Sequence, residues 1–218
     1  MKKYLAEFLG TFLLVFCGTG AIVINELSGG IITQPGIALV FGLVVASVIL
    51  VIGDQSGAHI NPAVTLAFFI NKSLSAKQAG SYITNQLAGG ISASFLLQFL
   101  FPSSNPLGST ASSVSTLQLF LWEGTLSFIL MLVILGVSQR GKINGIPAAI
   151  TVGTVVMLET YFALPLTGAS MNPARSFAPA LITGTWTDLW IYLLAPITGM
   201  ALAVAAWRLL HKQKILTR

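Results

Sequence analysis

Six long stretches of apolar residues alternate with short polar segments along the chain. They cover about residues 4–24, 35–53, 79–101, 117–138, 145–164 and 188–209. A helix needs about 20 apolar residues to cross a hydrocarbon core of about 30 Å, so each stretch is long enough to span a membrane. Glu159 interrupts the fifth stretch, and we expect this side chain to lie at the outer interface. The pattern predicts an all-α membrane protein with six transmembrane helices.

The composition agrees with burial in lipid. Hydrophobic residues make up 55% of the 218 residues and charged residues only 8%, with a mean hydropathy of +0.86. A soluble domain carries about a quarter charged residues, so there are too few charges here to cover a water-exposed surface. The net charge of +5 is spread singly or in pairs between apolar runs, which excludes the basic patch of a nucleic-acid-binding protein.

The positions of the basic residues predict the orientation in the membrane. Of the eleven Lys and Arg residues, all but Arg175 fall on one side of the six-span arrangement, which the positive-inside rule identifies as the cytoplasm. The first apolar stretch is longer than a signal-peptide core, so we expect a retained helix, cytoplasmic termini and a location in the cell (inner) membrane. The cytoplasmic set is Lys2, Lys3, Lys72, Lys77, Arg140, Lys142, Arg208, Lys212, Lys214 and Arg218.

The two halves of the chain repeat each other. Residues 56–67 read SGAHINPAVTLA and residues 167–178 read TGASMNPARSFA, with six of twelve positions identical. Glu7 and Glu123 also lie at matching places, early in the first span of each half. Because each half has three spans, the second half enters the membrane from the opposite face, and such inverted 3+3 repeats place their site near the midplane. We predict a single channel domain at 1–218, with repeats at about 1–110 and 111–218.

Each repeat contains an apolar segment that is too short to span, at 63–70 and 174–182. Both segments follow an Asn-Pro pair, and Asn is favoured as a helix N-cap while Pro is tolerated in the first turn. About ten helical residues reach roughly 15 Å, half of the apolar core. We therefore predict two half-helices whose N-termini meet at the centre of the membrane. They begin at Asn61, Pro62 and Ala63, and at Asn172, Pro173 and Ala174.

These features resemble the aquaporin, or major intrinsic protein, family. The resemblance rests on the six spans, the inverted repeat and the motifs SGAHINPAVT and TGASMNPARS. Within the family, the chain is similar to the bacterial-type water channels and shares features with the nodulin-like intrinsic proteins. The resemblance implies a right-handed helix bundle with two half-helices and a homotetramer with one pore in each subunit. It implies no enzyme activity, cofactor or metal.

The expected pore passes between the two half-helices. Their N-termini carry partial positive charge, and the Asn amides can donate to a passing oxygen, which interrupts the hydrogen-bonded chain along which a proton would hop. Backbone carbonyls of the preceding loops are expected to line the path, at Gly57, Ala58, His59, Gly168, Ala169 and Ser170. In the family, glutamates that match Glu7 and Glu123 accept hydrogen bonds from the loop N–H groups. His59 is either a gate or a structural histidine.

Arg175 is a lone charge within the membrane and is therefore a candidate functional residue. The resemblance implies that it forms the outer constriction with Phe41, Thr160 and Ala169. Strict water channels carry a His where this chain has Thr160, so we expect a wider ring. Tyr161 is the alternative if the helix is turned slightly.

Water is the first solute that the sequence predicts. Ser176 and Ala180 follow the water-channel pattern, whereas Leu193 after Tyr192 is similar to the nodulin-like channels and their bacterial relatives. The alternative is a channel mainly for small polyols or metalloid acids, such as glycerol and boric or arsenous acid. A coupled transporter would need titratable groups that change partners along the path, and a junction-forming protein finds no support in the short outer loops.

Overall fold

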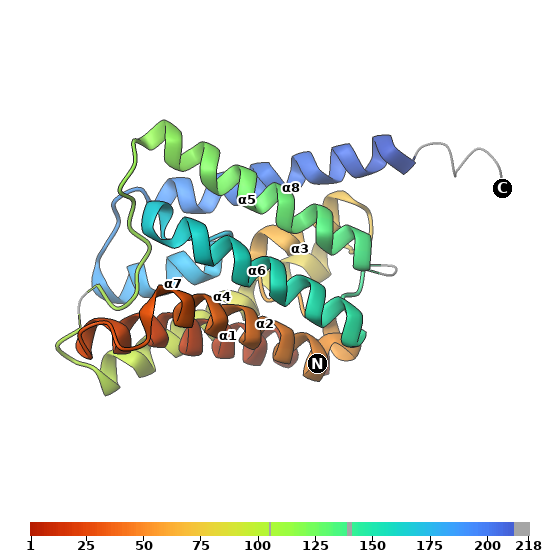
Figure 1. Ribbon diagram of the computed structural model, residues 1–218. Helices are drawn as coiled ribbons and strands as arrows, with labels where there is room; N and C mark the ends of the chain where they lie inside the picture. The colour runs from red at the N-terminus through yellow and green to blue at the C-terminus, as the bar shows by residue number, and fades with distance from the viewer. Residues whose placement is uncertain (105, 139–140, 212–218) are drawn as a thin grey trace.

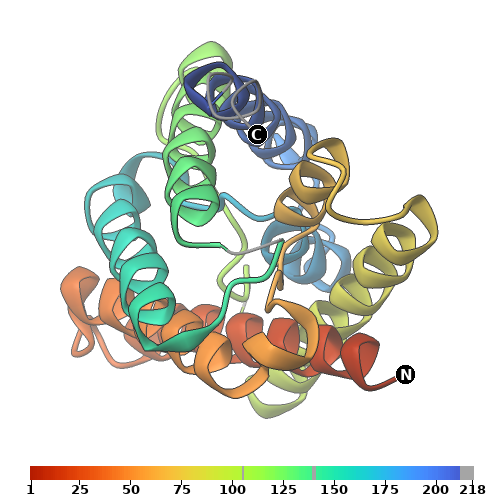
Figure 2. The same ribbon diagram turned by 90° about the vertical axis from the view of Figure 1, so that its right-hand side faces the viewer.

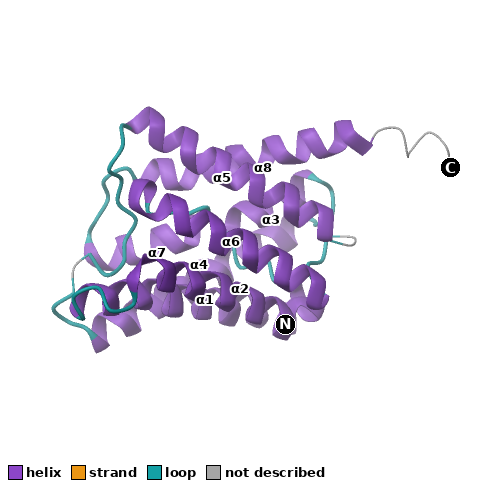
Figure 3. Ribbon diagram, viewed as in Figure 1, coloured by secondary structure: helices purple, strands orange, loops and turns teal. Residues whose placement is uncertain are grey.

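A computed structural model describes residues 1–104, 106–138 and 141–211. Helices and loops make up this part of the chain, and it contains no strand (Figure 3). The helices are α1 (Lys2–Leu27), α2 (Thr33–Ser56), α3 (Pro62–Ile70), α4 (Ala76–Leu100), α5 (Thr116–Val137), α6 (Gly145–Thr167), α7 (Pro173–Thr183) and α8 (Leu189–His211). Four residues of the predicted cytoplasmic set lie outside the described residues. They are Arg140, Lys212, Lys214 and Arg218.

Six of these helices are long and two are short, as the sequence predicts. The long helices contain 22 to 26 residues, whereas α3 has 9 and α7 has 11. Five of the long helices are apolar enough to cross a membrane by length and composition. The remaining one, α4, has 25 residues but includes polar side chains such as Gln86, which point into the bundle and are buried.

The two half-helices lie at opposite ends of the bundle. In Figure 1, α3 lies toward the end where the N-terminus is found and α7 toward the other end. Viewed along the bundle in Figure 2, the long helices form a ring and the segments leading into the half-helices run inside it. The two half-helices are in contact with each other.

The packing of the helices repeats between the halves. Helix α1 packs against α2 and α4, and α5 packs in the same way against α6 and α8. Helix α2 contacts α6 across the boundary between the halves. Each half-helix also contacts a long helix of the other half, since α3 packs on α8 and α7 packs on α4. The halves are therefore interlocked around the centre.

The α2–α6 contact depends on two facing glycines. A Cβ atom added to Gly42 would lie 2.7 Å from the carbonyl oxygen of Gly153, and one added to Gly153 would lie 2.6 Å from that of Gly42. Both distances are far below a van der Waals contact. Small residues allow this close backbone approach, which drives helix association where lipid removes the usual hydrophobic advantage.

The distribution of side chains is that of a multi-pass membrane protein. Large apolar residues such as Leu43, Phe99 and Leu202 are exposed on the outside of the bundle. Several charged and amide side chains, in contrast, are buried within it, and Glu7 and Glu123 have no exposed surface. A surface of this kind suits lipid, and the buried polar groups need partners inside the protein.

Candidate pore

Each half-helix begins at the Asn-Pro pair that the sequence indicated. Asn61 has extended backbone (φ −155°, ψ 120°) and its Oδ1 accepts from the N–H of Ala63 at 2.8 Å. The Oδ1 of Asn172 accepts from the N–H of Ala174 at 3.0 Å and from that of Arg175 at 3.4 Å. Both Asn residues are thus N-caps, and the Pro that follows each of them occupies the first helical position.

The same two side chains tie the half-helices together crosswise. The Nδ2 of Asn61 donates to the carbonyl of Met171 at 2.8 Å, and the Nδ2 of Asn172 donates to the carbonyl of Ile60 at 2.9 Å. Each partner is the residue before the opposite Asn. Because a primary amide carries two N–H groups, each Asn keeps a second donor beyond the one used in this contact. The positive ends of two helix dipoles therefore face each other at the centre.

The carboxylate of Glu7 holds the first loop from behind. It accepts from the N–H groups of His59 at 3.0 Å and Ile60 at 2.7 Å, and from the amide of Gln86 at 2.7 Å. The loop backbone is left-handed at Ala58 (φ 46°) and Ile60 (φ 44°), a conformation that costs energy for residues other than Gly. The buried carboxylate compensates by satisfying two N–H groups that point away from any helix ladder.

Glu123 holds the second loop in the same manner. It accepts from the N–H groups of Ser170 at 3.0 Å and Met171 at 2.8 Å, and from the hydroxyl of Thr167 at 2.8 Å. The left-handed residues recur at Ala169 (φ 43°) and Met171 (φ 51°). The two carboxylates thus occupy equivalent places in the two halves.

Two tyrosines add matching contacts that the sequence analysis missed. The hydroxyl of Tyr82 donates to the carbonyl of Ser56 at 2.8 Å, and that of Tyr192 donates to the carbonyl of Thr167 at 2.7 Å. Each accepting residue is the last of a helix, where carbonyls lack an intrahelical partner. The signal for Tyr82 was its spacing of four residues from Gln86, which puts the two polar side chains on one face of the helix.

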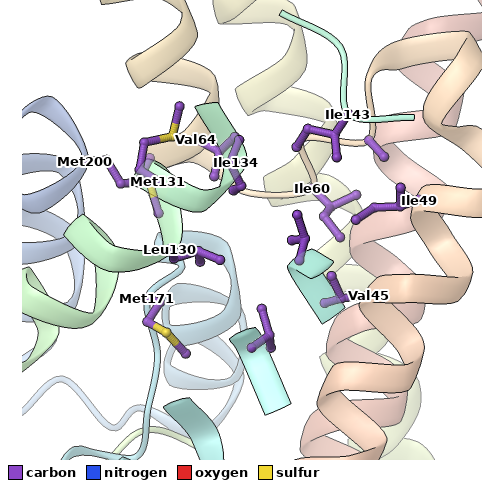
Figure 4. Packing of buried hydrophobic residues seen from close by; sticks show 14 of the residues in the cluster. Val45, Ile49, Ile60, Val64, Leu130, Met131, Ile134, Ile143, Met171 and Met200 are labelled. Carbon is purple, nitrogen blue, oxygen red and sulfur yellow. The ribbon is translucent and has the colours of Figure 1, made fainter. Parts of the chain in front are cut away.

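A cavity runs along the two loops. Most of its wall is aliphatic, and Figure 4 shows Val45, Ile49, Leu130 and Ile134 around the open centre. Polar side chains are confined to a few positions on the wall. They are His59, Asn61, Thr160, Ser170, Asn172 and Arg175. A mostly apolar wall with a few polar side chains favours the passage of small uncharged solutes. Such solutes bind weakly at the few polar positions and can therefore leave them again.

The four predicted constriction residues all line this cavity. The guanidinium carbon of Arg175 lies 5.5 Å from the centre of the Phe41 ring, and its Nη1 donates to the carbonyl of Gly108 at 2.9 Å. Arg175 is 1% exposed, and its Nε has no hydrogen-bond partner among the described residues. Thr160 and Ala169 line the same cavity.

The register of α6 selects Thr160 over Tyr161. Thr160 is 1% exposed and lines the cavity, whereas Tyr161 is 51% exposed and faces outward. The carbonyl of Tyr161 accepts from the side-chain amide of Gln34. The small hydroxyl, rather than the phenol, is the group that α6 presents to the cavity.

Gly57 and Gly168, whose carbonyls were predicted to line the path, each end a helix. Both are left-handed residues that end a helix, with φ of 91° and 76°, and neither lines the cavity. The carbonyl of Gly57 instead accepts from the N–H of Ile143 at 3.3 Å. The chain reverses direction at each Gly, so the residues that reach the cavity come after it. Those residues are Ala58, His59, Ala169 and Ser170.

The ring of His59 lies at the cavity wall and is held on several sides. Its Nδ1 is 3.1 Å from the hydroxyl of Thr65, its Nε2 is 3.4 Å from the carbonyl of Gly141, and it stacks on Phe68 with ring centres 4.7 Å apart. Both hypotheses for His59 therefore stay open: the ring is held by neighbouring groups, as a structural histidine would be, and it also borders the cavity, as a gate would.

Glu159 is not at the outer interface, contrary to the sequence prediction. Its side chain is 3% exposed, and neither carboxyl oxygen has a hydrogen-bond partner among the described residues. Helix α6 continues to Thr167, eight residues further (167 − 159 = 8), so Glu159 lies within the bundle rather than near a helix end. Within the same described part of the chain, no group of three or more His, Cys, Asp or Glu residues is placed to hold a metal.

A ring of lipid-facing helices, two half-helices joined head to head and a cavity along their loops define a helical membrane channel. The chain belongs to the major intrinsic protein family, since the model of that family, described as Major intrinsic protein, matches residues 1–207.

Individual relatives support the same assignment. Nodulin-26 of Glycine max is 41% identical over 200 residues, which cover 91% of this chain and 74% of that protein. Aquaporin NIP3-1 of Arabidopsis thaliana is 40% identical over 222 residues, which cover 98% of this chain and 69% of that protein. The X-ray structure of the aquaglyceroporin from Plasmodium falciparum has a TM-score of 0.83 at 28% identity, with 94% of each chain covered. The predicted fold class and the resemblance to nodulin-like proteins are confirmed.

Proposed function

We propose that this protein is a passive transmembrane channel for water that also admits small uncharged solutes. The observation that carries the proposal is the crosswise contact of Asn61 and Asn172, which places two helix N-termini and two amide groups beside one cavity. Membership of the major intrinsic protein family and the similarity to aquaporins support it. This geometry needs no chemical step, because the solute only exchanges hydrogen bonds as it passes.

The centre of the pore orients each water molecule. The remaining N–H of each Asn donates to the water oxygen, so both hydrogens of that water turn outward toward its neighbours. A proton cannot hop through a molecule held in this orientation, and the positive helix ends repel cations. Ala58, His59, Ala169 and Ser170 supply acceptors in the two loops, while Glu7 and Glu123 keep those loops in place.

The test compares two substitutions on one helix. Val156 lines the cavity, whereas Leu158 is exposed on the outside of α6. In proteoliposomes, Val156→Phe is expected to reduce water permeability to near that of bare lipid, and Leu158→Phe to leave it unchanged. Stopped-flow light scattering measures both. Wild-type vesicles that swell no faster than lipid would refute the proposal, as would equal permeability of the two variants.

The second candidate, a channel mainly for small polyols or metalloid acids, is favoured by the small size of Thr160 and Ala169. An imidazole at position 160 would narrow the constriction and add donors, so Thr160→His is expected to lower glycerol flux several-fold while water flux persists. Shrinkage of vesicles in glycerol and in sucrose separates the two fluxes. Equal glycerol flux in both proteins would remove Thr160 from the constriction.

We also propose that the chain acts as one channel domain, built from repeats at about 1–110 and 111–218, within a homotetramer in the cell (inner) membrane, with both termini in the cytoplasm. The family resemblance implies the tetramer, and an apolar groove between α1 and α2 offers a surface for a neighbouring copy. Leu9, Leu13, Leu43 and Val51 line this groove. Native mass spectrometry of the protein in detergent tests the number of subunits.

A further inference from the structure

Glu159 is a buried carboxyl group that the proposed mechanism does not use. It lies on α6 directly before Thr160, it is 3% exposed, and neither of its oxygens has a hydrogen-bond partner among the described residues. Buried polar groups are almost always hydrogen-bonded, and an isolated ionised carboxylate is far more costly to bury than a neutral acid. The exception therefore requires an explanation.

The surroundings of Glu159 do not supply a counter-charge. Helix α6 packs against α2 and α5, and it has no other charged residue of its own. The charged residue of α2 is Asp54, which lies near the cytoplasmic end and accepts from the side chain of Asn144 at 3.1 Å. The charged residue of α5 is Glu123, and this is the ionisable group that acts on Glu159. Arg175 and Tyr192 also lie close to Glu123.

The internal repeat shows that packing alone does not need a carboxyl group at this place. Glu159 lies eight residues before the end of α6 at Thr167, and Val48 lies eight residues before the end of α2 at Ser56 (56 − 48 = 8). Val48 is also buried, at 3% exposed. A valine thus fills the equivalent position in the half whose loop is held by Glu7, so the carboxyl in the second half is an added chemical feature.

We infer that Glu159 is a proton-binding site, occupied at neutral pH and emptied at alkaline pH with a loss of conduction. Release converts the carboxylic acid to a carboxylate and passes the proton to water, and the reverse reaction restores the acid. This inference rests on the proposed function, because conduction is one of its readouts.

Glu123 connects the proton site to the pore. An ionised Glu159 places a second negative charge near Glu123, and two like charges in a buried setting disfavour each other. Glu123 holds the N–H groups of Ser170 and Met171, and the same loop carries Ala169 and leads to Arg175. A disturbance of Glu123 therefore acts first on the loop that leads to the predicted constriction, whereas Glu7 holds the other loop.

Infrared spectroscopy tests occupancy directly. The C=O stretch of a protonated carboxyl group is expected in wild-type protein at neutral pH and is expected to be lost in Glu159→Gln and Glu159→Val. Glu26→Gln is the matched control, because Glu26 is an exposed carboxyl at the end of α1 and should leave the band unchanged. A band that persists in both Glu159 variants would overturn the proton site.

Water permeability over a pH series tests the consequence. Wild type and Glu26→Gln are expected to lose conduction several-fold on going from neutral to alkaline pH, and both Glu159 variants to stay constant. The same pH response in wild type and Glu159→Gln, or a flat response in both, would overturn the link to conduction. Failure of the proposed function can be told apart from failure of this inference. If the protein is not a channel, wild-type vesicles are no more permeable than lipid at any pH, while the infrared band still reports whether Glu159 is protonated.

Discussion

The two half-helix regions of the molecule share one supporting frame but differ in the side chains that they present to the cavity. In each, an Asn caps the short helix and reaches across to the other loop, and a buried Glu accepts two loop N–H groups. A Tyr hydroxyl donates to the last residue of the preceding helix in both halves. The supporting frame, which consists of the capping Asn, the buried Glu and the Tyr, is therefore repeated in both halves.

The cavity-facing positions do not follow the repeat. The third residue after the capping Asn is Val64 in the first half and Arg175 in the second, and the residue that matches Ile49 is Thr160. Both differences make the second half more polar. The comparison indicates that the repeated residues hold the loops in place, and we propose that the residues that break the repeat make the channel selective.

The largest effect is expected from breaking the frame in either half. Glu7→Ala and Glu123→Ala each remove the acceptor of three buried donors, so each is expected to lower the free energy of unfolding by roughly 2–6 kcal/mol. Thermal unfolding in detergent measures the loss, with Glu26→Ala as an exposed control. If one variant were destabilised and the other not, the two halves would not share an equivalent frame.

A smaller effect is expected from removing the asymmetry. Arg175→Val gives the second half the residue type found at Val64, and it removes both the guanidinium and its contact with the carbonyl of Gly108. The constriction should widen, so urea permeability is expected to rise several-fold while water permeability changes little. Lys77→Val, which removes an exposed positive charge, serves as the control in the same light-scattering assay. Unchanged urea permeability in Arg175→Val would place selectivity elsewhere.

Much of this comparison could be predicted from the sequence, for a physical reason. Asn61, Asn172, Glu7 and Glu123 act through local or repeated chemistry, in which a cap must adjoin its helix and a buried charge must have a partner. Such requirements leave a mark in the order of residues. The head-to-head meeting of the half-helices followed from the odd number of spans in each repeat.

The remaining features depend on the direction of the backbone after each helix and on the exact length of the helices, which a hydropathy pattern does not encode. Gly57 and Gly168 end helices in the left-handed conformation, and the residues that follow them are the ones that line the cavity. Glu159 was expected at the interface, where a charge costs little, but its side chain is buried and α6 continues for eight residues beyond it to Thr167 (167 − 159 = 8). Tyr82 was missed because its partner, a helix-terminal carbonyl, carries no signature in the sequence.

The smallest effect is expected from the two tyrosines. Tyr82→Phe and Tyr192→Phe each remove one hydroxyl and leave one helix-terminal carbonyl without that donor, so each is expected to cost about 0.5–1.5 kcal/mol of unfolding free energy. Because both rings stay in place, water permeability should be retained, and the two losses should be equal within the error of thermal unfolding measurements. The double variant should lose the sum of the single losses, since the two carbonyls belong to different halves and share no partner. A loss confined to Tyr192→Phe would show that the second half needs its frame more than the first, because that half also holds the buried guanidinium of Arg175.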